Sequence, residues 1–310
     1  MAGQARRRPL KIGLQLPEIE YVARWRELSA MARRAEELGF DSLWVGDHLL
    51  YRNPGDVSKG PWEAWSMMAA LAAVTDRVEI GPLVACTSFH NPAMIAKKAA
   101  TIEEISDGRL ILGLGAGWNE VEYTTYGYPY DNRVSRFEEA FTIIRTLLAT
   151  GRCDFHGDYY RVADCELLPP GPRPGGPPLM IGSEGPRMLR IALPWVHSWN
   201  AWYAWFRNDP ANLPPLLEKI DAACRDVGRD PATLEKTCAA LVAVSGAKGR
   251  LAGDPTDRGA RALSGTPEEL AAVMRQYAAA GVGHLQVILD PNTLAAIEEF
   301  APVLELLDRG

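Results

Sequence analysis

The sequence predicts a (β/α)8 TIM barrel with inserted loops, formed by a single α/β domain. Three observations lead to this fold class. Short apolar segments alternate with amphipathic helical patterns, the apolar segments number eight, and 310 residues suit one barrel with insertions. A doubly wound open sheet is the alternative, because periodicity does not show whether a parallel sheet closes on itself.

The predicted strands are short apolar runs, most of them rich in β-branched or large aliphatic residues. Each run is followed by a stretch with helical periodicity, as expected for repeated βα units. The eight strands are predicted at residues 10–16, 41–47, 78–86, 109–115, 178–182, 195–200, 238–245 and 284–289.

Two helices have especially clear boundaries. The first has Gly39 as a left-handed C-terminal stop. The last but one is capped by Thr266, has Pro267 in its first turn and is closed by Gly281. The apolar face of the first helix consists of Trp25, Leu28, Met31, Ala35 and Leu38.

The domain is predicted to span residues 10–310, after a disordered polar leader at 1–9. Three segments do not fit the βα repeat and are interpreted as insertions. Residues 116–131 form an aromatic loop, 151–177 a hairpin with a Pro-rich and Gly-rich loop, and 245–262 a polar loop. In a barrel, such loops cover the face that carries the chemistry.

The composition excludes several classes of function. Apolar residues make up 47% of the chain, enough for a large core, so a disordered protein is excluded. The net charge is -6 without a basic stripe, and no segment approaches the ~20 apolar residues of a membrane span. Neither a nucleic acid nor a membrane is therefore predicted as partner. The five scattered cysteines favour reduced thiols in a cytoplasmic protein.

Candidate catalytic residues are sought directly after each strand, because barrel enzymes carry their sites at the C-terminal strand ends. His48 follows the second strand and can donate a hydrogen bond or a proton near neutral pH. Its neighbour Asp47 points the opposite way on an extended chain and has a different role. A structural Asp-His pair at a strand corner is the alternative.

A second candidate follows the fifth strand, where Gly182, Ser183, Glu184 and Gly185 precede a helix opened by a proline. Backbone N–H groups there could bind a phosphate, with Arg187 adding positive charge. An ordinary tight turn is the alternative.

The earlier GLGAG tract at 113–117 fails the dinucleotide fingerprint, because Trp118 occupies the last glycine position. No clustered metal ligands or hydrolase motifs occur, so no metal is predicted. Aromatic residues gather in two loop regions, where Trp118, Tyr123 and Trp202 are predicted to shape a substrate pocket. A lid packed on itself or a subunit interface is the alternative.

Five blocks of sequence resemble the bacterial luciferase-like family of flavin- and F420-dependent oxidoreductases. They span nearly the whole chain in order and agree with the strand count. The blocks are DSLWVGDHLL at 41–50, ATIEEISDGRLILGLGAGWNEVEYTTYGYPY at 100–130, NRVSRFEEAFTIIRTLL at 132–148, PPLMIGSEGPRMLRIA at 177–192 and SGTPEELAAVMRQYAAAGVGHLQV at 264–287.

The resemblance implies coenzyme F420 or FMN as cofactor, bound in the barrel mouth. His48 would lie near the reactive edge of the ring, as the catalytic residue, with Asp47 close to the cofactor. A non-proline cis peptide pressing on the ring is expected around Ala85 and Cys86. Asn119 would contact the polar rim of the cofactor.

The same resemblance makes Gly182 to Gly185 the phosphate loop, although two departures leave the cofactor open. The family commonly has Gly-Gly-Ser-Gly there, and Glu184 would repel a phosphate unless it turns outward. Around the sixth strand, Val196-His197-Ser198-Trp199-Asn200 replaces the common Ala-Asp-Gly-Trp-Asn.

The leading hypothesis is an oxidoreductase or monooxygenase acting on a small organic substrate. F420 is slightly preferred, since the chain is rich in Arg, Ala and Gly. The use of FMN would require a separate flavin reductase, and a homodimer is expected. A non-catalytic flavin-binding protein on the same fold, or an interaction protein that has lost its site, are the alternatives.

Overall fold

The computed structural model describes residues 8–52, 57–248 and 260–309. Its main sheet is parallel, with the strand order β3-β2-β1-β11-β10-β9-β8-β5-β4. The strands are β1 Lys11–Gln15, β2 Ser42–Val45, β3 Glu79–Pro82, β4 Ala85–Cys86, β5 Leu112–Gly115, β8 Leu179–Ile181, β9 Ser198–Ala201, β10 Glu235–Ala243 and β11 His284–Asp290.

The sheet closes on itself because β3 and β4 are two halves of one barrel strand. They are separated by Leu83 and Val84, whose peptide bond is cis. β3 pairs with β2, β4 pairs with β5, and a parallel bridge joins Ile80 to Leu110. The barrel therefore has eight strands, which confirms the predicted fold class and excludes the open sheet.

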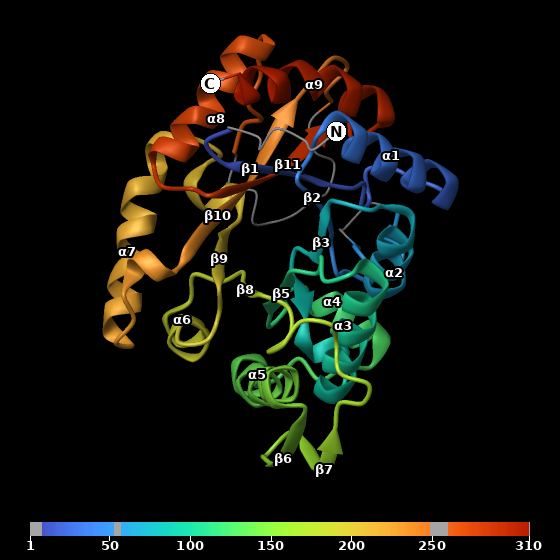
Figure 1. Ribbon diagram of the computed structural model, residues 1–310, viewed down its shortest axis with the longest axis vertical. Helices are drawn as coiled ribbons and strands as arrows, with labels where there is room; N and C mark the ends of the chain where they lie inside the picture. The colour runs from blue at the N-terminus through green and yellow to red at the C-terminus, as the bar shows by residue number, and fades with distance from the viewer. Residues whose placement is uncertain (1–7, 53–56, 249–259, 310) are drawn as a thin grey trace.

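Helices surround the strands (Figure 1). The α-helices are α1 Trp25–Leu38, α2 Ala64–Val74, α3 Pro92–Ser106, α4 Glu120–Tyr126, α5 Arg133–Thr150, α6 Pro186–Ala192, α7 Leu213–Asp226, α8 Pro267–Ala279 and α9 Leu294–Asp308. Short 3-10 helices are η1 Thr87–Phe89, η2 Tyr203–Phe206, η3 Pro210–Asn212 and η4 Pro231–Thr233. Among the described residues, no helix has the length and hydrophobicity that a membrane crossing needs.

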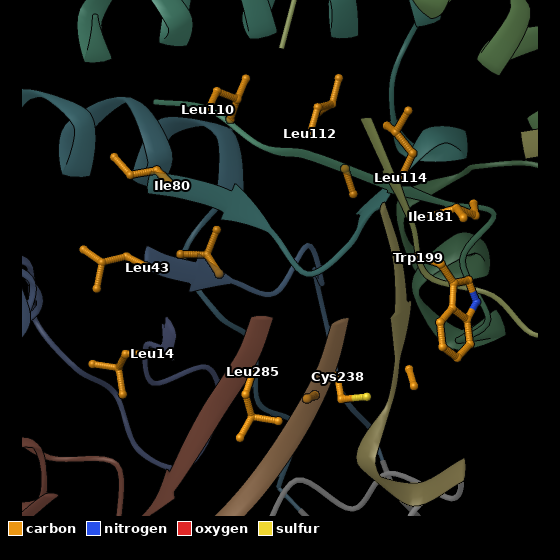
Figure 2. Packing of buried hydrophobic residues seen from close by; sticks show 14 of the residues in the cluster. Leu14, Leu43, Ile80, Leu110, Leu112, Leu114, Ile181, Trp199, Cys238 and Leu285 are labelled. Carbon is orange, nitrogen blue, oxygen red and sulfur yellow. The ribbon is translucent and has the colours of Figure 1, made fainter. Parts of the chain in front are cut away.

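Side chains alternate along each strand between the helices and the barrel interior. One large buried cluster joins strand side chains to those of the surrounding helices. Figure 2 shows Leu14, Leu43, Leu112 and Leu285, from four different strands, within this cluster. This layer contributes most of the apolar burial that holds the helices on the barrel.

Trp44 fills the barrel interior and is fully buried. Glycines make room for it: a Cβ on Gly13 would lie 2.6 Å from the indole Nε1, and one on Gly81 2.6 Å from Cζ3. Ile111 and Met180 complete this inner layer. The interior is thus packed at this level, and open space begins nearer the C-terminal ends of the strands.

The predicted helix ends at Gly39 and Thr266 are present in the structure. Gly39 caps α1 with a φ of 100°, a left-handed conformation that glycine adopts without strain. Thr266 forms a capping box with Glu269 at the start of α8. Local sequence therefore decided where these two helices begin and end.

The inserted segments differ in structure. Residues 151–177 contain the hairpin of β6 Arg152–His156 and β7 Arg161–Glu166, which lies beyond α5, away from α8 and α9 (Figure 1). Residues 116–131, expected to be a loop, contain the helix α4, which ends at Gly127 with a φ of 78°. Most of the third insertion, residues 249–259, lies outside the described residues.

The chain is already fixed to the barrel at Arg8. Residues 1–7 of the predicted leader lie outside the described residues, but the Arg8 side chain is buried. Its guanidinium is 2.7 Å from Asp308 and 3.1 Å from Asp41. These ion pairs join the start of the chain to α9 and to the residue before β2, so the expectation of disorder is wrong for Arg8.

Candidate functional site

A pocket of about 400 Å³ opens at the C-terminal ends of the barrel strands. Strand ends and the loops that follow them supply its walls, as the barrel fold predicts. The residues that line it include Gln15, Glu18, Asp47, His48, Tyr51, Leu83, Val84, Cys86, Gly115, Trp118, Glu122, Arg133, Gly182, Ser183, Glu184, Gly185, Asn200, Trp202 and Trp205.

His48 is held in one orientation by Glu122. The Nδ1 atom of the imidazole lies 3.0 and 3.1 Å from the two carboxylate oxygens, and the backbone N–H groups of Leu49 and Leu50 donate to the same carboxylate. Glu122 is buried in α4, whereas the His48 side chain is 20% exposed. With Nδ1 engaged, Nε2 is the nitrogen that remains for a ligand in the pocket.

The carboxylates around His48 set its protonation. Burial alone lowers the pKa of the imidazole, because it disfavours the charged form. The hydrogen bond that the imidazole makes to Glu122 and the negative charges of Glu18, Glu122 and Asp47 act in the opposite direction. The net effect is a pKa of His48 above its ordinary value.

A second acidic group, Glu18, lies beside the end of β1. Its carboxylate accepts a hydrogen bond of 2.7 Å from the Tyr51 hydroxyl and one of 3.3 Å from Gln15 Nε2. Gly46 leaves the space for this carboxylate, since a Cβ there would lie 2.7 Å from Glu18 Cδ. The pocket therefore has three buried acidic side chains near His48: Glu18, Asp47 and Glu122.

Asp47 connects two strand ends. Its carboxylate accepts a hydrogen bond of 2.8 Å from the backbone N–H of Cys86 and lies 3.8 Å from His90 Nε2. It thus fixes β4 against the end of β2. Burial raises the pKa of the Cys86 thiol to about 12, which keeps this side chain protonated and unreactive.

Aromatic side chains also line the pocket. The centroid of the Trp118 ring lies 5.6 Å from that of the His48 ring, and the centroid of the Tyr51 ring lies 4.8 Å from it. Trp202 and Trp205 are further lining residues. Trp118 and Trp202 both line the pocket, where the sequence places them. The Trp118 side chain is 36% exposed.

The segment Gly182 to Gly185 lies in the pocket wall as predicted, but its surroundings differ from those of a strong phosphate loop. The Glu184 carboxylate lies 3.5 Å from Lys219 Nζ on α7. The backbone N–H of Gly185 is directed to Ser183 Oγ at 3.3 Å. Phosphate binding at these residues stays a prediction.

Arg187 lies outside the pocket wall. Its guanidinium donates to Glu138 at 2.8 Å and to Ser135 at 3.0 Å, both on α5, and it does not line the pocket. The sequence places Arg187 in the first turn of α6 but does not show which face it occupies, and its part in cofactor binding stays a prediction. Arg133 is the arginine in the pocket wall.

Asn119 and Tyr123 do not line the pocket, and the cis peptide lies earlier in the chain than expected. Asn119 donates to the Leu50 carbonyl at 2.9 Å, so its amide holds the β2–α2 loop. Tyr123 is fully buried and donates to the Ala116 carbonyl at 2.7 Å. The cis peptide joins Leu83 to Val84, two residues before the expected Ala85, which packs in the core. Leu83 and Val84 line the pocket instead.

Several residues that line the pocket were not predicted from the sequence. Gln15 ends the first strand and Glu18 follows it, so the rule of inspecting strand ends would have found them. Asn200 lies near the end of the sixth barrel strand, β9, where the same rule applies. Glu122 has no such signal, because it lies on a helix inside an insertion and meets His48 across 74 residues. In the described part of the chain, no group of three His, Cys, Asp or Glu side chains could hold a metal ion.

Known proteins resemble the chain over most of its length. Residues 11–248 match a family described as luciferase-like monooxygenase. F420-dependent glucose-6-phosphate dehydrogenase from Amycolatopsis mediterranei (strain U-32) is 38% identical over 189 residues, 59% of this chain and 54% of that protein. Pyrimidine monooxygenase RutA from Stutzerimonas stutzeri (strain A1501) is 28% identical over 309 residues, 93% of this chain and 81% of that protein.

A third relative, 5,10-methylenetetrahydromethanopterin reductase from Archaeoglobus fulgidus, is 33% identical over 184 residues, 59% of this chain and 50% of that protein. The chain thus matches this reductase and the dehydrogenase over about half of their length. Among solved structures, an F420-dependent secondary alcohol dehydrogenase in complex with an F420-acetone adduct has a TM-score of 0.80 at 22% identity, covering 96% of this chain and 99% of that one. At this identity the likeness supports the fold.

Proposed function

The chain belongs to the luciferase-like monooxygenase family, and from this premise we propose that it is an oxidoreductase. It uses a flavin-type cofactor, coenzyme F420 or reduced FMN, on a small organic substrate. The observation that carries the proposal is the fixed imidazole of His48, which lies in the wall of the pocket at the C-terminal barrel face. An imidazole with one nitrogen held by a carboxylate is well suited to moving a proton at its other nitrogen.

The pocket suits the face of a planar ring. Leu83 and Val84 form an apolar wall. Gly115 and Gly182 leave space beside it, since a Cβ on Gly115 would lie 2.9 Å from the Val84 side chain and one on Gly182 would lie 3.1 Å from it. Aromatic side chains line the same pocket and suit a planar ring. When bound, the ring supplies hydride transfer as F420 or oxygen activation as reduced FMN.

The side chains of the protein bind and orient the cofactor and the substrate, and they move a proton. Glu122 fixes the imidazole through Nδ1, so His48 Nε2 holds or releases the proton at the reacting oxygen of the substrate. The raised pKa of His48 favours its protonated form, which can donate a proton. The tryptophans at positions 118, 202 and 205 exclude water from the reacting groups.

Hydride transfer with F420 is the preferred form of the proposal. Support comes from the 38% identity to a protein named as an F420-dependent dehydrogenase and the 33% identity to one named as a reductase. A second candidate, monooxygenation with reduced FMN, is favoured by the likeness to a pyrimidine monooxygenase that covers 93% of this chain. This second candidate needs reduced FMN from a separate flavin reductase.

The test begins with equilibrium binding of FMN and F420 to the purified protein by fluorescence quenching, followed by anaerobic and aerobic turnover. Tight F420 binding with oxygen-independent turnover supports the preferred form. Binding of reduced FMN with oxygen consumption supports the second candidate. Binding without any turnover would leave a flavin-binding protein, and failure to bind either cofactor would overturn the proposal.

A further inference from the structure

The floor of the pocket contains two buried amide side chains, Gln15 and Asn200. Gln15 ends β1 and is 1% exposed, and Asn200 lies in β9 and is 3% exposed. Both line the pocket, yet neither belongs to the wall that suits a planar ring or to the His48 group. Buried polar groups in proteins are nearly always hydrogen-bonded, so the partners of these two amides show what the floor offers to a ligand.

The orientation of the Gln15 amide is set by Glu18. Gln15 Nε2 lies 3.3 Å from Glu18 Oε2, and the Tyr51 hydroxyl donates to Glu18 Oε1 at 2.7 Å. A carboxylate accepts hydrogen bonds, so the amide nitrogen must be the atom that faces it. Gln15 Oε1 is then left buried without a hydrogen-bond partner among the described residues.

The Asn200 amide is oriented by neighbouring strands. Its Nδ2 donates to Thr237 Oγ1 at 2.8 Å and to Gln286 Oε1 at 2.7 Å. The Thr237 hydroxyl donates to the Trp199 carbonyl at 3.2 Å, so its oxygen accepts from Asn200. Because both amide hydrogens of Asn200 are used, its carbonyl oxygen is the polar atom that it offers to the pocket.

The floor therefore presents acceptors. Gln15 Oε1, the Asn200 carbonyl and the nearby Glu18 carboxylate are groups that accept hydrogen bonds and donate none. A buried acceptor left without a donor is costly, because it has lost its bonds to water. A ligand group that donates a hydrogen bond removes this cost, whereas an ether oxygen leaves it in place and an anion adds repulsion from Glu18.

We propose that Gln15 and Asn200 form a subsite for a hydrogen-bond donor, either the hydroxyl of an alcohol substrate or a ring N–H of the cofactor. The subsite selects against groups that only accept hydrogen bonds and against anions. The inference rests on the proposed function, which supplies the two sources of such a donor. It adds the chemical class of group that the deep end of the pocket takes.

Two ligand series on the wild-type protein test the subsite. In the first, FMN is compared with its 3-methyl derivative, in which the ring N–H is replaced. In the second, benzyl alcohol, benzyl methyl ether and benzoate are titrated by NMR into the protein with and without F420. A lost hydrogen bond to a buried acceptor is expected to weaken binding by about tenfold. Benzoate is expected to bind weakest.

Each outcome assigns the donor or removes the subsite. Weaker binding of 3-methyl-FMN than of FMN assigns the donor to the cofactor. Preference for the alcohol over the ether assigns it to the substrate. Equal binding within both series overturns the inference. Failure to bind any cofactor overturns the proposed function instead, and the alcohol series on the cofactor-free protein still tests the subsite.

Variants link the preference to Gln15. Gln15→Met replaces the amide with an apolar side chain of similar length, so it is expected to abolish the tenfold preference in whichever series shows it. Gln276→Met makes the same change on the exposed face of α8 and is expected to keep the preference. A preference that survives in Gln15→Met would show that Gln15 is not the acceptor.

Discussion

Two histidines of the barrel, the buried His284 and the partly buried His48, have pKa values shifted in opposite directions. His284 lies in the interior at the start of β11, where its Nε2 is 2.7 Å from Ser42 Oγ. The Trp44 indole donates to the same hydroxyl at 2.7 Å. Burial, with a smaller contribution from Lys11, lowers the pKa of His284 to about 3.

His48 at the barrel mouth shows the contrary behaviour, although burial also opposes its charge. Glu122, Glu18 and Asp47 surround it with negative charge, and its pKa lies above the ordinary value. The comparison teaches that burial lowers the pKa of an imidazole unless acidic side chains lie close enough to oppose it. Burial decides the pKa of His284 in the core, whereas the neighbouring carboxylates raise the pKa of His48 at the site.

The largest expected effect comes from removing the imidazole at the mouth. For His48→Ala, kcat should fall by about 10²–10⁴, the range typical of general acid–base catalysis. Cofactor affinity should stay close to that of the wild-type protein. Steady-state kinetics together with fluorescence titration of the cofactor measure both quantities. A variant with wild-type kcat would show that His48 does not move the proton.

Removing the charge of Glu122 should reduce the contrast between the two histidines. In Glu122→Gln the pKa of His48 should fall, because the largest of the groups that raise it becomes neutral. The His48 limb of the kcat/KM profile should then move to lower pH, with a loss of activity of about tenfold or more. Glu120→Gln, an exposed change on the same helix, is the matched control.

The same variant has a signature in stability. A raised folded-state pKa stabilises the protein fully below the unfolded value of about 6.5, and this contribution is lost as pH rises through the folded-state value. The stability difference between wild type and Glu122→Gln should therefore be largest in mildly acidic solution. Urea unfolding at several pH values measures it, and a pH profile identical to that of the wild type would contradict the role of Glu122.

His284 predicts a loss of stability in acid. Its folded-state pKa lies near 3, below the ordinary value of 6.5, so the unfolded chain takes up a proton first as pH falls. Stability should decline between pH 6.5 and 3, by an amount on the order of 5 kcal/mol at most. His284→Asn should unfold with a flatter pH dependence across this window. An unchanged slope would indicate that other groups cause the acid sensitivity.

The smallest effect is expected at Arg187. Its guanidinium is bound to Glu138 on the outside of the barrel, so Arg187→Ala should change FMN and F420 affinity by less than about twofold. Its matched comparison is Arg133→Ala, which alters the arginine in the pocket wall. If Arg187→Ala weakened the cofactor strongly, the assignment of Arg187 to the outer surface would be wrong.

The sequence by itself determined the eight strands and the position of His48, Asp47 and the 182–185 turn at the pocket. These follow from local periodicity and from the rule that barrel sites gather at the C-terminal strand ends. Such information is local, because each strand and each turn is encoded within about ten residues of chain.

Only the tertiary structure decided which side chains meet. Glu122 reaches His48 from an inserted helix, Arg187 turns to α5, and the Gln15 amide is oriented by Glu18. Each of these contacts depends on the direction of a side chain and on the packing of a distant segment. Sequence spacing carries neither quantity, because a helix or loop with the same residues can present a different face to the barrel.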